Sequence, residues 1–257
     1  MARRVSKRAW EGYTRRLEAQ RAAAYDDAYE WVVRNVPSRG RLDMKRLRLM
    51  MVEAANHHGK STAALAATWF DQMARAEGAD AMKAVPVNDT AKTRVKRMAI
   101  CSNKALPKLE AGDVEGFARA IASAVAADVK RQATNTVMLN AQKNGAEYAW
   151  IPGGAETCAF CIALAANGWQ PAAKATAMGE HADHIHDNCE CEFAIRFNES
   201  TEYGAYDAQK YADIYGDADG RSSQDKINSI RRELYAENRD KINEQHRERY
   251  AAMNGGG

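Results

Sequence analysis

The sequence predicts an α+β protein that is predominantly α-helical. In it, a helical N-terminal body precedes a small β-containing Cys/His module and a charged C-terminal helix. Apolar residues recur at three- and four-residue steps through most of the N-terminal half, as on one face of a helix. The step changes to two between Cys189 and Phe197, which is typical of a strand. The last part of the chain is highly charged and keeps only a thin apolar stripe. We therefore expect domains at residues 1–147, 148–200 and 201–257.

Composition and charge limit the class of protein and the compartment that we expect for it. Of the 257 residues, 46% are apolar and 28% are charged, which is ordinary for a globular chain. The formal net charge of +3 is too small to predict nucleic-acid binding by itself. The N-terminus has no apolar h-region and no apolar run is long enough to span a bilayer, so we expect neither a signal peptide nor a membrane segment. The cysteines should then remain reduced, which favours metal binding over disulfides.

The N-terminal body is predicted to begin with three helices. The first is expected over residues 6–36 and ends at Pro37. The second is expected over residues 42–58, with Gly59 as its C-cap. Ser61 would then cap the start of a third helix. The aromatic and methionine residues of these helices fall on their apolar faces and are expected in the core.

A looser stretch is expected over residues 77–107, which proline and asparagine interrupt. A further helix is expected over residues 113–144, with an inner face of small and branched apolar residues. Its other face is polar and is expected to contact solvent. That face holds Lys130, Arg131, Asn135 and Asn140.

The module is expected to contain two strands. Residues 148–151 form a short apolar run before a Pro-Gly-Gly turn. Residues 189–197 read CECEFAIRF and alternate strictly, which predicts a half-buried strand. The charged C-terminal helix is expected over residues 223–253. Because it has few apolar positions, it should pack on a partner or lie exposed.

The cysteines suggest a metal site in this module. Cys158 and Cys161 form a C-x-x-C pair, and an H-x-x-C-x-C segment follows about 25 residues later. Thiolate and imidazole are the ligands that zinc prefers, and four protein ligands make a closed, structural site. The preferred ligands are Cys158, Cys161, His186 and Cys189. Cys191 is the reserve ligand, because a regular strand would place it about 6–7 Å beyond Cys189.

Other interpretations of these residues remain open. The cysteines are also compatible with small buried apolar residues, or with a pair that forms only on oxidation. The C-x-x-C pair is also a redox motif, but no thioredoxin-like βαβ pattern surrounds it. Asp183, His184 and Ile185 match the core of HNH nucleases, in which a histidine is the general base beside a metal.

Two segments, TCAFCIALAANGWQP and HDNCECEF, resemble the cysteine–histidine region of phage head morphogenesis proteins. These are the minor capsid proteins related to the F protein of phage Mu, and the likeness is to the type found in phages of actinobacteria. The specific part of the match covers about a fifth of the chain. The matching positions are Trp150, Gly154, Cys158, Ala159, Phe160, Cys161, Leu164, Ala165 and Gly168 in the first segment, and His186, Cys189 and Cys191 in the second.

The resemblance implies a non-enzymatic, low-copy component of a tailed-phage head. Its expected partners are the portal and major capsid proteins, with packaged DNA as a further candidate, and neither a membrane nor a small-molecule substrate is expected. The implied location is the capsid interior of the virion, and the host cytoplasm during assembly. Structural zinc is the expected cofactor, as a staple for a module that is too small to supply a full core.

Two other functions compete with this expectation. One is a metal-dependent, HNH-like nuclease that acts on DNA, and the other is a regulatory zinc-ribbon protein with salt-dependent DNA binding. The family often has proline after the histidine and arginine between the last two cysteines. This chain has Asp187 and Glu190 there, and these acidic side chains argue against DNA binding at that rim.

Overall fold

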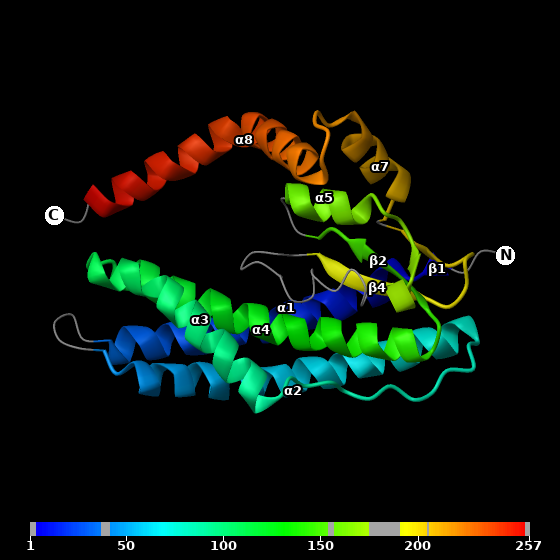
Figure 1. Cartoon of the computed structure of the whole chain (residues 1–257), viewed down its shortest axis with the longest axis horizontal. Helices are drawn as coiled ribbons and strands as arrows, with labels where there is room; N and C mark the ends of the chain where they lie inside the picture. The colour runs from blue at the N-terminus through cyan, green and yellow to red at the C-terminus, as the bar shows by residue number, and fades with distance from the viewer. Residues whose placement is uncertain (1–3, 37–41, 154–156, 175–190, 205, 255–257) are drawn as a thin grey trace.

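A computed structural model describes residues 4–36, 42–153, 157–174, 191–204 and 206–254, with side chains as far as residue 239. The protein is predominantly helical with a small antiparallel sheet, which confirms the predicted α+β class. Figure 1 shows the long helices side by side, with the sheet against them and the C-terminal helix farther out, on the opposite side of the sheet from these helices. None of the helices within the described ranges is both long and apolar enough to cross a bilayer.

Four helices form the body. They are α1 (Lys7–Asn35), α2 (Met44–Glu77), α3 (Ala91–Glu110) and α4 (Val114–Lys143). Each begins after a residue whose side-chain oxygen accepts a hydrogen bond from a backbone N–H of the first turn, which stabilises the helix start. These N-cap residues are Ser6, Asp43, Thr90 and Asp113. All three other helices pack against α4, which is therefore the centre of the body (Figure 1).

The expected break at Gly59 is wrong, because α2 continues through it to Glu77. Gly59 is buried where α2 meets α4, and a Cβ atom at this position would lie 3.0 Å from the Gln132 Cγ atom. One turn later, the Thr62 hydroxyl donates to the Val129 carbonyl of α4 across 3.1 Å. Glycine is therefore used here for close approach of two helices, and Gly78, with a φ of 69°, ends the helix instead.

The expected loose stretch is only partly right. Residues 79–90 are irregular, but residues 91–110 form α3, with Pro107 in its last turn. Two arginines of α3 fix it to α4. Arg94 donates to Asp128 across 2.8 Å, and Arg97 donates to the other oxygen of the same carboxylate.

The expectation that one face of α4 contacts solvent is wrong for three of its four named residues, and only Asn135 is partly exposed. Lys130, Arg131 and Asn140 are only 6%, 5% and 3% exposed. Lys130 forms an ion pair with Glu192 of the module at 3.1 Å, and Arg131 lies 3.6 Å from the buried Asp128 carboxylate. The central helix can bury these polar groups because each has a partner.

Irregular residues 79–90 are held along α4 by what we call the amide ladder. In it, α4 side chains spaced four residues apart bond to backbone groups of this segment. Asn140, for example, accepts from the Val85 N–H at 3.0 Å and donates to the Val85 carbonyl at 2.9 Å. The rungs are Gln132 to Asp89, Thr136 to Val87, Asn140 to Val85 and Asn144 to Met82. Between Gln132 and Asn140 each step is four helical residues, which rise about 6 Å, against two extended residues, which rise about 6.6 Å, so these two spacings nearly match. The last step, from Val85 to Met82, is three residues.

The sheet has the order β3-β2-β4, and both pairings are antiparallel. Its strands are β3 (Gln170–Pro171), β2 (Glu147–Ile151) and β4 (Glu192–Arg196). The 3₁₀ turn η1 (Ala172–Lys174) directly follows β3. Both predicted strands are thus present, with Trp150 opposite Phe193. The strand β4 is not half-buried as expected: neighbouring residues Ala194 and Ile195 point to opposite faces, yet both are fully buried.

The module shares its core with the helical body. One hydrophobic cluster includes Trp10 of α1, Trp69 of α2, Val137 of α4 and Phe193 of β4, and so extends across the expected boundary at residue 147. The apolar residues of the module thus pack into a core that the helical body also supplies, and that the module alone is too small for a full core stays a prediction. The three-domain division itself remains a prediction.

The two-stranded sheet was missed by the sequence analysis. β1 (Arg4–Val5) pairs in parallel with β5 (Glu202–Tyr203) and so joins the start of the chain to the segment after the module. Parallel pairing of two short segments so far apart leaves no signature in either sequence.

The C-terminal part contains α7 (Ala208–Asp217), which the sequence analysis did not assign, and α8 (Ser223–Asn254), which confirms the predicted charged helix. The first turns of α8 pack on α7 and on the short helix α5 (Ala159–Ala165) through Ile227 and Ile230. Figure 1 shows the rest of α8 continuing along the long axis of the molecule.

Candidate functional site

Three cysteine sulfurs meet where α5 passes the start of β4. Cys158 is the N-cap of α5, and its Sγ accepts from the Cys161 N–H at 3.3 Å. Its Sγ also lies 3.0 Å from the Cys161 Sγ. Cys161 is joined in a disulfide to Cys191, and their Cα atoms are 6.5 Å apart. The C-x-x-C segment and the end of the H-x-x-C-x-C segment therefore converge, although 30 residues separate Cys161 from Cys191.

The structure thus brings three of the five expected metal ligands together. Cys158, Cys161 and Cys191 form the cluster, whereas His186 and Cys189 lie outside the described residues. Cys191, the reserve ligand in the sequence analysis, is the member of the second segment seen in contact with the pair. The nuclease-like Asp183, His184 and Ile185 also lie outside the described residues.

The oxidised pair differs from the expectation of reduced thiols. A disulfide sulfur is not a thiolate and does not serve as a zinc ligand. With Cys161 and Cys191 joined, the described part of the chain holds no group of three or more His, Cys, Asp or Glu side chains arranged for a metal ion. Zinc binding therefore remains a prediction about the reduced protein.

The sulfur cluster would need little movement to accept zinc once it is reduced. Sulfurs about 2.3 Å from one tetrahedral zinc ion lie about 3.8 Å apart. Cys158 and Cys161, at 3.0 Å, are somewhat closer than that. Cys161 and Cys191 are each only 2% exposed, whereas Cys158 is half-buried, so two of the three sulfurs are packed into the protein. A closed structural site fits this burial better than a catalytic one, which keeps a position for water.

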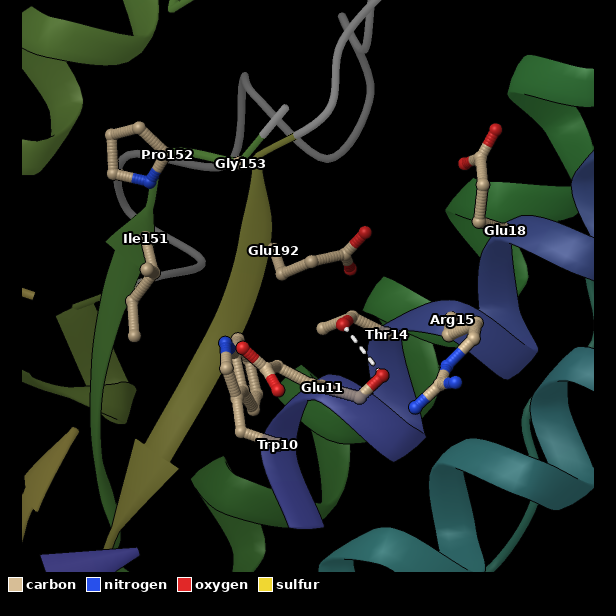
Figure 2. Close-up of a pocket in the computed structure, with 9 residues that line it drawn as sticks. All are labelled: Trp10, Glu11, Thr14, Arg15, Glu18, Ile151, Pro152, Gly153 and Glu192. Carbon is tan, nitrogen blue, oxygen red and sulfur yellow. Dashed lines mark hydrogen bonds between the residues drawn. The ribbon is translucent and has the colours of Figure 1, made fainter. Parts of the chain in front are cut away.

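A cavity of about 600 Å³ lies beside the residue that follows Cys191. Figure 2 shows Glu192 directed from β4 toward α1, where Glu11, Thr14 and Arg15 line the same cavity. Burial raises the pKa of Glu192, and the charge of Lys130 opposes that shift. The sequence analysis missed this ion pair because it placed Lys130 on a solvent-exposed face.

Comparisons with known proteins give one match. A family model described as VG15 protein matches residues 4–218 of the 257, from β1 to just after α7, and does not include α8. No curated protein and no solved structure matches the chain.

Proposed function

The chain belongs to the VG15 protein family and is a phage protein, and from this premise we propose that it is a minor capsid and head morphogenesis protein. It would be of the type related to the F protein of phage Mu and would act by assembly rather than catalysis. It would associate with the portal and major capsid proteins inside the head, with packaged DNA as a further partner.

The convergence of the cysteine segments is the observation that carries the proposal. The resemblance to head morphogenesis proteins rests on the segments that hold Cys158, Cys161 and Cys191, and these sulfurs are in contact or joined. A cross-link between α5 and β4 would keep this part of the chain in one shape while it is bound by a much larger assembly. The covered sheet and the shared core also suit a structural role.

The C-terminal helix supplies a surface for such an assembly. Among the side chains described after Leu234, which end at Arg239, none belongs to the cluster that holds the first turns of α8, and Tyr235 is 56% exposed. It also lies beyond the family match. We assign this half of α8 to contacts with portal or capsid subunits.

The direct test is the protein content of purified virions. Mass spectrometry of capsids from the phage that encodes this chain should find it at a few copies to tens of copies per head, far below the major capsid protein. A chain that ends at Leu234 should fold with the same melting temperature but be depleted from heads. The proposal is wrong if purified heads contain none of the full-length protein.

A metal test separates the structural cofactor from a plain disulfide. The reduced protein should contain about one zinc per chain, and Cys161→Ser should lose it because one thiolate ligand is gone. Cys101→Ser, on α3, is the matched control and should retain the metal. If the reduced protein contains no zinc and Cys158→Ser leaves the melting curve unchanged, then the staple is not a metal.

A plasmid-nicking assay addresses the nuclease alternative. Magnesium, manganese and zinc are each supplied to the purified protein, with His184→Ala as the control. Cleavage that depends on a metal and is lost in this variant would replace the assembly role with an enzymatic one.

A further inference from the structure

A second cavity, of about 590 Å³, lies between the start of the chain and the end of α2. Apolar walls come from Val5, Met73 and Ala76. Three further lining residues are polar and more than nine-tenths buried: Trp69 is 3% exposed, Glu77 8% and Thr201 1%. A cavity of this size is within the usual range for small ligands and for inserted side chains.

Each of the three polar residues has an atom that lacks a partner. The Trp69 Nε1, the Glu77 Oε1 and the Thr201 Oγ1 find no hydrogen bond among the described residues. Buried polar groups of natural proteins are almost always paired. Three unpaired groups that line one cavity therefore indicate a site for a ligand rather than three separate packing defects.

Two backbone N–H groups hold the carboxylate of Glu77 in place. Its Oε2 accepts from the Phe197 N–H at 2.8 Å and from the Asn198 N–H at 2.9 Å, which leaves Oε1 free to accept from a ligand. Burial raises the pKa of the neighbouring Tyr203, and the negative charge of Glu77 adds to the shift. Glu77 is the only ionisable residue among the described residues that line the cavity, so a cation that enters it would meet a carboxylate and no competing basic side chain there.

We propose that this cavity binds an alkylammonium group, such as the end of a lysine side chain or of a free diamine. The ammonium would donate to Glu77 Oε1 and to the Thr201 hydroxyl, and charge-assisted bonds of this kind are among the strongest in proteins. The methylene stem would lie against the apolar walls. A lysine residue of a partner would also offer a backbone carbonyl to the Trp69 N–H, whereas a diamine would not.

The Trp69 indole N–H provides the readout in a proton–nitrogen NMR spectrum of the full chain. Titration with 1,5-diaminopentane and with N-acetyl-lysine methylamide should shift this signal in a saturable way, and added salt should weaken the binding. Tighter binding of the lysine derivative would identify a protein partner as the source. Tighter binding of the diamine would identify a free amine.

Variants test the role of the carboxylate. Glu77→Gln keeps an oxygen for the Phe197 and Asn198 N–H groups but removes the charge, and it should weaken binding at least about tenfold. Glu53→Gln, an exposed carboxylate on the same helix, is the matched control and should not change binding. If Glu77→Gln does not fold, Ala76→Trp at the exposed mouth should block entry without touching the carboxylate.

The proposal fails under three outcomes. The first is an indole signal that does not move at saturating amine, which would mean that water alone fills the cavity. The second is equal binding of 1-pentanol, which has the stem but not the charge. The third is equal weakening by Glu53→Gln and Glu77→Gln.

Discussion

Two helices of similar length, α4 and α8, have opposite positions in the molecule. The 30-residue α4 is central and buried, whereas the 32-residue α8 packs through its first turns and then continues along the long axis of the molecule (Figure 1). Both carry many polar residues. On α4 the polar side chains have specific partners, such as Asp128 with Arg94 and Asn140 with Val85. On the described part of α8 they bond mainly to near neighbours of the same helix, such as Ser229 to Glu233.

The difference teaches that polarity along a helix does not predict exposure. A polar group can be buried when the fold supplies its partner. Any substitution that removes that partner then lowers the free energy of unfolding. Substitutions on α4 should therefore destabilise the protein far more than chemically equivalent substitutions on α8.

The largest effect is expected at Asp128, which is fully buried and faces Arg94, Arg97 and Arg131. Asp128→Ala leaves these arginines without their shared carboxylate and should lower the free energy of unfolding by about 3–5 kcal/mol. Urea denaturation followed by circular dichroism measures the change. Glu53→Ala, exposed on α2, should stay within about 0.5 kcal/mol of the parent. Equal losses at the two positions would contradict the importance of the buried network.

A smaller effect is expected for the amide ladder. Asn140→Ala removes the partners of the Val85 N–H and carbonyl and should cost about 1–3 kcal/mol. Hydrogen exchange at the Val85 amide should accelerate at the same time. Asn228→Ala on α8 is the matched control, since this side chain bonds only to Gln224 and Arg231 in the described contacts. The ladder is not what holds residues 79–90 if Val85 exchange is unchanged in Asn140→Ala.

Substitutions of two glycines, one packed against α4 and one with no neighbouring atom, should change stability in opposite directions. Gly59→Val places a branched side chain against Gln132 and should destabilise the protein by about 1–3 kcal/mol. Gly12→Ala on α1 meets no atom within 4 Å and should stabilise the protein by about 0.5–1 kcal/mol, because alanine loses less backbone entropy. Thermal melting distinguishes the two signs. Stabilisation by Gly59→Val would mean that α2 and α4 are not closely packed there.

The smallest effect is expected on α8. Tyr235 is 56% exposed, so Tyr235→Ala should change stability by less than about 0.5 kcal/mol. Incorporation of the Tyr235→Ala variant into phage heads should nevertheless fall if this half of α8 binds the portal or capsid. A large drop in melting temperature would show instead that the helix is part of the folded body.

Much of the fold could be predicted because it depends on local patterns. Periodicity predicted the bounds of α1, α4 and α8 to within about two residues, since an apolar stripe and a cap are local signals. Gly59 was misread because the same residue can end a helix or allow close approach, and only the neighbouring helix decides. Lys130 was misread because its partner, Glu192, lies far along the chain.

The two candidate sites also differ in how far local sequence signals could predict them. The spacing of the two cysteine segments carries a chemical signature, so a meeting of Cys158 and Cys161 with the second segment could be expected. That Cys191, the reserve ligand, is the residue that joins Cys161 could not, because it depends on how β4 passes α5. The cavity at Glu77 could not be predicted, because its walls come from the start of the chain, the end of α2 and Thr201. None of these residues belongs to a motif, and only the fold places them together.

The pairing of β1 with β5 has a consequence for synthesis on the ribosome. Arg4 is translated almost 200 residues before its partner Glu202. The first strand must therefore wait, unpaired, while α1, α2 and α4 can already assemble behind it. The β1–β5 sheet can close only after residue 203 has been made, so a truncated product that stops before residue 202 would leave the edge of β1 unpaired.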